Sequence, residues 1–171
     1  MLFTTLLSGL LILGGALAQT TPPGFTPAVN KTLDVIYNTQ VITPGLLVKK
    51  SSTCPEPGTP RGTVLHALLQ DWAPNGQTQN GSSILTTKAT GPASYFGPAP
   101  PAETPKHPHN YIFLLHQQPD NFAVPAAHKT AVSGRMAINW PKFITDAGLS
   151  EPIAANYLQV QSGDNTKSFV A

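Results

Sequence analysis

The chain has 171 residues and a formal net charge of +2 at pH 7, and only 11% of its residues are charged, against roughly 25% in typical soluble domains. Because no run of Lys or Arg occurs, the composition gives little support to a nucleic-acid-binding function. The single cysteine, Cys54, excludes an intramolecular disulfide and any multi-cysteine zinc site.

Residues 1–18 are uncharged and apolar, and they end in Ala-Leu-Ala, the small-x-small pattern that a signal peptidase accepts. This pattern predicts a secretory signal peptide. The alternative is a membrane anchor, but an apolar run of about 17 residues is at the short limit for spanning a bilayer. By length, residues 19–171 then form a single domain. We therefore expect a secreted protein with no transmembrane segment after signal removal.

Two N-glycosylation sequons occur in polar, turn-like surroundings. Asn30 begins the sequence Asn-Lys-Thr, and Asn80 begins the sequence Asn-Gly-Ser. Glycans would add solubility to an extracellular protein with so few charges, and the sequence therefore predicts a glycoprotein.

Short segments rich in apolar and β-branched residues alternate with Pro- and Gly-rich stretches, which is the pattern of a β-rich domain with long loops. The segments that we expect to be strands are 33–37, 39–43, 111–115 and 153–161. Residues 63–72 (TVLHALLQDW) are mostly apolar and fit either a core strand or a short helix. Residues 74–83 (PNGQTQNGSS) are predicted to form a polar loop.

One segment near the C-terminus predicts a helix. Asn139 can cap it, Pro141 is acceptable in its first turn, and Gly148 ends it after Asp146 and Ala147. Together these elements predict a mainly β domain with a small helix near its end.

Histidine carries most of the possible chemistry of the chain. His107 and His109 are two residues apart, so in an extended segment they share one face and could begin a metal site. A third ligand would have to come from His66, His116 or His128, and packed or surface histidine is the commoner explanation of so short a motif. We therefore predict neither a metal nor a cofactor.

Nucleophilic catalysis has less support still. The sequence contains no Gly-x-Ser-x-Gly elbow, and its eight acidic residues are scattered, so no pair of carboxylates for acid–base chemistry stands out. We expect a protein that is not an enzyme.

Three stretches, in the same order along the chain, resemble the signature of the phosphatidylethanolamine-binding protein family. YFGPAPPAETPKHPHNYIFLL, from Tyr95, is similar to the family's Tyr-x-Gly-Pro-x-Pro-Pro turn, short spacer and His-Arg-Tyr before an apolar strand. VLHALLQDW is similar to its Leu-His-Trp segment, and INWPKFITDAGLSEPIAANYLQVQ to its late stretch with Pro-Val-Ala-Gly-Asn-Phe-Phe. The resemblance is clearest over residues 64–161 and looser in the earlier LDVIYNTQVITPG.

The resemblance implies a central antiparallel β-sheet, a smaller sheet and short helices near the C-terminus. It also implies a shallow pocket that holds phosphate-like anions and, in several members, a phospholipid headgroup. Carried over to the matching positions, the pocket residues are His66, Ala99, Pro100, Pro101, His109 and Tyr111. Imidazole N–H and phenol O–H groups are donors, and a pre-formed ring of donors can replace the water around a phosphate.

Two departures from the family pattern concern the charge and the size of this region. Asn110 stands where the family has the arginine of His-Arg-Tyr, which removes a cation. The Asp-Pro-Asp-x-Pro motif has its nearest equivalent in Cys-Pro-Glu-Pro at residues 54–57, which makes Glu56 the candidate replacement. The resemblance implies an apolar strand before that motif. The sequence does not predict such a strand here, because the stretch in its place, LLVKKSST, is too short and too charged. Either a core strand has been lost or the sequence lacks a segment.

We therefore expect a secreted binding protein for phospholipid headgroups or small phosphate-like anions. The main alternative is a protein-interaction role as an inhibitor of proteases or kinases, and the second is a metal-dependent hydrolase that uses His107 and His109. If His66 and His109 line an anion site, affinity should rise as the pH falls, because protonated imidazole offers only donors and a positive charge.

Overall fold

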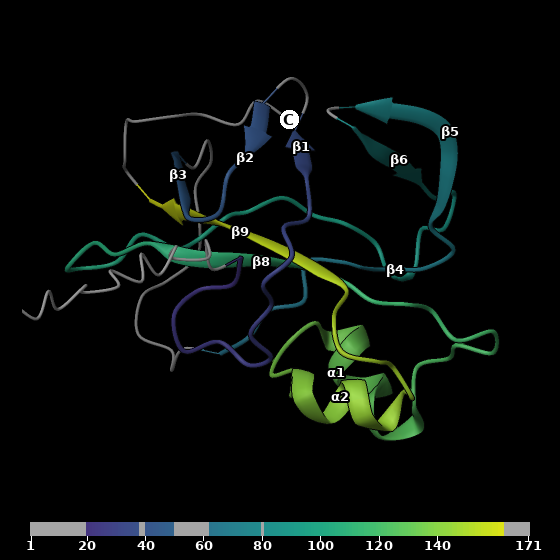
Figure 1. The fold of residues 1–171 in the computed structure, drawn as a ribbon. Helices are drawn as coiled ribbons and strands as arrows, with labels where there is room; N and C mark the ends of the chain where they lie inside the picture. The colour runs from purple at the N-terminus through teal and green to yellow at the C-terminus, as the bar shows by residue number, and fades with distance from the viewer. Residues whose placement is uncertain (1–19, 38–39, 50–61, 80, 163–171) are drawn as a thin grey trace, which may run out of the picture.

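A computed structural model describes residues 20–37, 40–49, 62–79 and 81–162 of the chain. Within these ranges the protein consists mainly of β-strands, and short helices lie towards the C-terminal end (Figure 1). The predicted fold class is thereby confirmed. No helix in the described ranges is long and apolar enough to cross a membrane.

The largest sheet of the described ranges has three strands in the order β3-β9-β8. Its strands are β3 (Leu46–Lys49), β8 (His109–Leu115) and β9 (Ala154–Gln161). β8 and β9 are antiparallel, from His109 opposite Val160 to Leu115 opposite Ala154, whereas β3 joins the other edge of β9 in parallel. β9 therefore crosses the molecule as the middle strand (Figure 1).

The remaining described strands form antiparallel pairs. They are β1 (Val35–Tyr37) with β2 (Gln40–Ile42), β4 (Leu68–Leu69) with β7 (Pro92–Ala93), and β5 (Ala73–Gln79) with β6 (Ser82–Thr86). The helical elements are η1 (Ala126–His128), α1 (Lys129–Gly134) and α2 (Trp140–Asp146). The labelled helices α1 and α2 lie together at the end of the molecule away from β1, β2, β5 and β6 (Figure 1).

The first core cluster is centred on β9. Leu158 and Val160 are fully buried and pack with Ile42 of β2. Tyr111 and Phe113 of β8 pack against this cluster from the neighbouring strand. Burial of a side chain such as Leu158 contributes about 1.5–3 kcal/mol, so these contacts hold β8 firmly against β9.

Asn156 joins the N-terminal segment to β9 through a buried amide. Its Nδ2 donates to the carbonyl oxygens of Leu33 and Ile42, both at 2.8 Å, and its Oδ1 accepts from the backbone N–H of Tyr157 at 2.8 Å. Burying an amide group without such partners would cost free energy, and Asn156 is fully buried. Its hydrogen bonds connect β9 with itself and with the N-terminal segment.

The second core cluster packs the helices against the segment that carries His66. Ala93 of β7, Val132 of α1 and Phe143 of α2 belong to its buried centre, and Leu65 and Leu68 pack against it. The segment around His66 therefore has a fixed backbone, because its neighbours on either side are anchored in this core.

Helix α2 begins and ends where the sequence predicts. The side chain of Asn139 accepts from the backbone N–H of Lys142 at 3.2 Å, and a proline occupies the first turn. Gly148 follows the helix with a φ of +64°, a left-handed conformation that glycine adopts without strain.

The predicted strands at 33–37, 39–43, 111–115 and 153–161 are confirmed as β1, β2, β8 and β9, with small shifts at their ends; residue 39 itself lies outside the described ranges. Residues 63–72, for which strand and helix were both open, contain the two-residue strand β4 and no helix.

Two predictions are wrong. The loop prediction for residues 74–83 is wrong, because residues 74–79 belong to β5 and residues 82 and 83 to β6, and the two strands pair antiparallel. All seven residues of β5 are exposed, so no apolar alternation marks the strand. The expectation that LLVKKSST, residues 46–53, is too short and too charged for a strand is also wrong, because residues 46–49 form β3, which pairs with β9. Joining the edge of an existing strand requires backbone hydrogen bonds, which neither feature prevents.

Some sequence predictions fall outside the described residues. These are the signal peptide over residues 1–18, the candidate pocket residue Glu56 and the sequon residue Asn80. Asn30 of the other sequon is described and is exposed.

Candidate functional site

The predicted pocket residue His66 is tied to Phe96, thirty positions away in the sequence. The backbone N–H of Phe96 donates to the carbonyl oxygen of His66 at 3.0 Å, and the His66 ring lies 4.0 Å from the Phe96 ring between centroids. Nδ1 of His66 is 2.9 Å from the Phe96 carbonyl oxygen. Because a carbonyl oxygen can only accept, Nδ1 carries the hydrogen, and in neutral His66 the other nitrogen, Nε2, has a lone pair.

His66 also meets β8 at Tyr111. The two rings lie edge to face, with centroids 4.9 Å apart and an interplanar angle of 74°. Tyr111 and His109 are two residues apart on β8, so they share one face of the sheet. The structure thus brings His66 and Tyr111 together, and places His109 at the start of the same strand.

The proline-rich turn lies between Phe96 and His109 in the chain. Pro100 is fully buried, whereas Ala99 and Pro101 are half-buried. The turn follows Phe96, which is bonded to His66, and leads to His109 at the start of β8. Both ends of the turn are therefore attached to fixed parts of the fold, and its three prolines have restricted φ angles.

The protonation of His66 depends mainly on its burial. Removal from water disfavours the imidazolium and lowers the pKa of His66 below its ordinary value. Backbone hydrogen bonds to Phe96 and Gly97 oppose this shift, and the positive charge of Arg135 lowers the pKa a little further. At neutral pH the ring is accordingly neutral, with Nδ1 as its donor.

Arg135 is a cation near this region that no sequence motif indicates. Its Cζ lies 5.1 Å from the Phe96 ring centroid, and its guanidinium donates to the carbonyl oxygen and hydroxyl of Ser94 at 2.8 and 2.9 Å. The backbone N–H of Leu65 donates to the Arg135 carbonyl oxygen at 2.8 Å, which brings the two chain segments together. Arg135 belongs to none of the matching motifs, so only the fold reveals its place.

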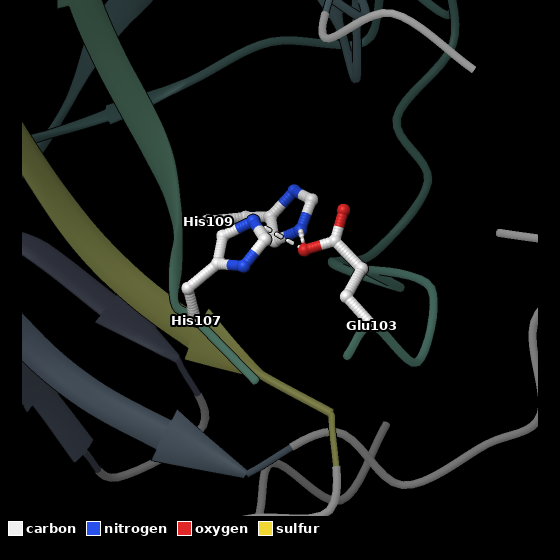
Figure 2. Close-up of side chains that lie close together, drawn as sticks. All are labelled: Glu103, His107 and His109. Atoms are coloured by element: carbon white, nitrogen blue, oxygen red, sulfur yellow. Dashed lines mark hydrogen bonds and ion pairs between the residues drawn. The ribbon is translucent and has the colours of Figure 1, made fainter. Parts of the chain in front are cut away.

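His107 and His109 meet a carboxylate instead of a third histidine. Figure 2 shows the Glu103 carboxylate directed at both rings. Oε2 of Glu103 lies 3.1 Å from Nε2 of His109 and in close contact with Nε2 of His107. The two imidazole rings are stacked, with centroids 5.4 Å apart and planes inclined by 12°. Glu103 lies between the proline turn and the histidines, and no known motif of this region marked it.

The other histidines lie in different surroundings. His116 has Nδ1 at 2.8 Å from the carbonyl oxygen of Ser150 and packs against Trp140. Nε2 of His128 is hydrogen-bonded to a carboxylate oxygen of Asp146 at 2.7 Å. Among the described residues, Glu103 is therefore the one whose side chain converges on one point with those of His107 and His109. The side chains of His66, His116 and His128 do not join this group.

A comparison with protein families matches residues 50–161 to the model described as Phosphatidylethanolamine-binding protein. This match includes all of the predicted pocket positions, Glu56 among them.

Two curated relatives carry the same name, Phomoidride biosynthesis cluster protein N. The protein from Talaromyces stipitatus is 32% identical over 98 residues, which are 55% of this chain and 48% of the relative. The protein from a fungal species (strain ATCC 74256) is 36% identical over 72 residues, which are 40% of this chain and 32% of the relative. The chain thus spans about half or less of the relatives that it matches, and no solved structure matches it.

Proposed function

Because the chain belongs to the phosphatidylethanolamine-binding protein family, we propose that it is a non-enzymatic binding protein whose shallow pocket takes phosphate-type anions, either free or in a phospholipid headgroup. The observation that carries this proposal is the ring contact between His66 and Tyr111, with His109 two residues along the same face of β8. An imidazole that is protonated on Nε2 and a phenol at this spacing can donate to one small anion between them.

The charges around the pocket determine how strongly an anion binds. Arg135 favours an anion, although its guanidinium also serves to hold Ser94 and Leu65. Glu103 disfavours one, because its carboxylate contacts His109. Neutral His66 contributes little, since its Nδ1 hydrogen is already bonded to Phe96. A proton on Nε2 would turn the ring into a charged donor, and charge-assisted hydrogen bonds are the strong ones.

The proposal includes secretion and glycosylation. Its support is the signal-like sequence of residues 1–18, the low content of charged residues and the exposed position of Asn30 in its sequon. Expression in a eukaryotic secretory host tests both points: the protein should enter the medium without residues 1–18, and its mass should fall on treatment with an N-glycosidase. Retention of residues 1–18 in the purified protein would contradict the proposed secretion.

Calorimetric titration of the purified protein tests the pocket itself. With a chelator present, inorganic phosphate, phosphoethanolamine and glycerophosphoethanolamine are titrated in turn; tighter binding of the two ethanolamine compounds than of phosphate would identify a headgroup site. At pH 5.5, where more of His66 is protonated than at neutral pH, the substitution His66→Ala should weaken binding roughly tenfold to a hundredfold, because a hydrogen bond to a charged group contributes about 1.5–3 kcal/mol.

A matched control for this substitution is Asn110→Ala. Asn110 is exposed and lies on the opposite face of β8 from His109 and Tyr111, where its side chain accepts a hydrogen bond from Gln159. This variant should bind the anion as the unsubstituted protein does. Equal losses of anion affinity in the two variants would mean that the anion does not bind beside His66.

A second candidate function, binding of a protein partner, is favoured by exposed large apolar side chains near the same region. Tyr95 is 45% exposed, Phe96 38% and Met136 55%. Aromatic residues and methionine are enriched at protein interfaces. Inhibition assays on secreted proteases test this candidate; inhibition that Phe96→Ser abolishes would favour it, and its absence would leave anion binding as the better-supported function.

A further inference from the structure

We propose that Glu103, His107 and His109 form a binding site for a divalent transition-metal ion of the zinc class. One carboxylate oxygen and one nitrogen from each ring all lie within 4.8 Å of one another, and all three residues are half-buried. This proposal does not rest on the proposed anion pocket, although the two sites share His109.

The hydrogen-bond roles of these side chains leave a place for a cation. Nδ1 of His107 is 3.1 Å from the carbonyl oxygen of Pro105, which can only accept, so this nitrogen carries the hydrogen. Nε2 of neutral His107 therefore presents a lone pair to a carboxylate oxygen of Glu103, with which it is in close contact. A positive charge between these two atoms stabilises the contact, and either a proton on Nε2 or a metal ion can supply it.

The same bond to Pro105 is the kind of support that metal-ligating histidines have. Such a histidine usually donates its second ring N–H to a carbonyl or carboxylate, which fixes the tautomer and the orientation of the ring. His109 is fixed in a different way, since it begins β8 and pairs with Val160 of β9. The ring of His107 is thus oriented by Pro105, and the backbone of His109 is held by β9, before any ion binds.

The ligand set indicates which ion fits. Two imidazole nitrogens and one carboxylate oxygen suit zinc and its first-row neighbours, with bonds of about 2.0–2.2 Å, whereas calcium and magnesium prefer oxygen ligands. Three protein ligands leave at least one coordination position for water or an anion. An ion here would also neutralise Glu103, the carboxylate that otherwise opposes an anion at His109.

The test is a titration of chelator-treated, dialysed protein with zinc chloride in a phosphate-free buffer, followed by calorimetry. We expect one equivalent to bind. Each of the substitutions Glu103→Gln and His107→Ala should weaken binding about tenfold or more, since loss even of an outer-shell partner costs 10–100-fold. Asp120→Asn, which removes an exposed carboxylate elsewhere, is the control and should leave zinc binding unchanged. No zinc binding, or equal weakening in all three variants, would overturn the proposal.

Thermal unfolding guards against variants that lose their fold. One equivalent of zinc should raise the Tm of the unsubstituted protein and of Asp120→Asn equally, and it should raise the Tm of Glu103→Gln and of His107→Ala by less. The proposed function is tested separately, because phosphate titration is carried out with a chelator and zinc titration without phosphate. A zinc-induced rise of Tm that is as large in Glu103→Gln and His107→Ala as in the unsubstituted protein would place the metal elsewhere and refute the assignment.

Discussion

The pH dependence of anion binding follows from the hydrogen bond between His66 and Phe96. Nδ1 of His66 donates to the Phe96 carbonyl oxygen at 2.9 Å, so a second donor arises only when Nε2 takes up a proton. Burial holds the pKa of His66 below its ordinary value, so the free protein is largely unprotonated there at pH 7.5. Binding of an anion to the protonated ring is then accompanied by the uptake of one proton.

This linkage sets the size of the effect. Above the pKa of the free ring, affinity rises by up to about tenfold for each pH unit that is removed, because one pH unit corresponds to 1.36 kcal/mol for one proton. Since the pKa of His66 is lowered, the rise continues below pH 6.5 instead of levelling off there. We expect a gain of roughly tenfold between pH 7.5 and 6.5 and a further gain towards pH 5.5.

The assay is calorimetric titration with glycerophosphoethanolamine at pH 7.5, 6.5 and 5.5 in the presence of a chelator. A phosphodiester is chosen because a phosphate monoester loses charge near pH 6, which would confuse the profile. The substitution His66→Asn should flatten the profile, while Asn110→Ala should retain it. A profile that is flat in the unsubstituted protein, or equally steep in His66→Asn, would refute the reasoning.

Two further predictions concern stability. Burial lowers the pKa of His116, whose Nδ1 donates to Ser150 and whose buried Nε2 has no partner in the described ranges, so the unfolded chain binds a proton here more readily than the folded chain. The free energy of unfolding should therefore be at its full value above pH 6.5 and should decrease as the pH falls below it. Urea denaturation should show a shallower decrease in His116→Asn. The substitution Asn156→Ala leaves the carbonyl oxygens of Leu33 and Ile42 without their donor and should cost about 2–5 kcal/mol, measured by the same method; a loss below about 1 kcal/mol would mean that water replaces the amide.

The sequence determined the elements whose signals are local. Helix α2 has its cap at Asn139 and is followed by Gly148, and in the second half of β9 the buried Leu158 and Val160 alternate with half-buried residues, so neither depends on knowledge of a distant segment. The motif around Tyr95 likewise identified the family and, with it, the positions of His66 and Tyr111. The predictions of α2, of β9 and of the family are confirmed, and those of the two elements succeeded because capping, turn formation and side-chain alternation are properties of consecutive residues; the pocket roles of His66 and Tyr111 stay predictions.

Only the tertiary structure decided the strands that lack such signals. β5 is exposed at all seven positions and β3 is a short segment at the edge of β9. Both are held by backbone hydrogen bonds to a partner strand, and every residue except proline can make these bonds. The pattern of side chains along the sequence therefore does not predict these two strands.

The charged groups of the candidate site were also decided by the fold. Arg135 reaches Phe96 from a segment 39 positions later in the chain because its backbone pairs with Leu65. Glu103 meets His107 and His109 because the loop after the proline turn folds back on the start of β8 (Figure 2). Coulomb interactions depend on distance in space and not on separation in sequence. The sequence therefore shows which residues are charged but not which residues they contact.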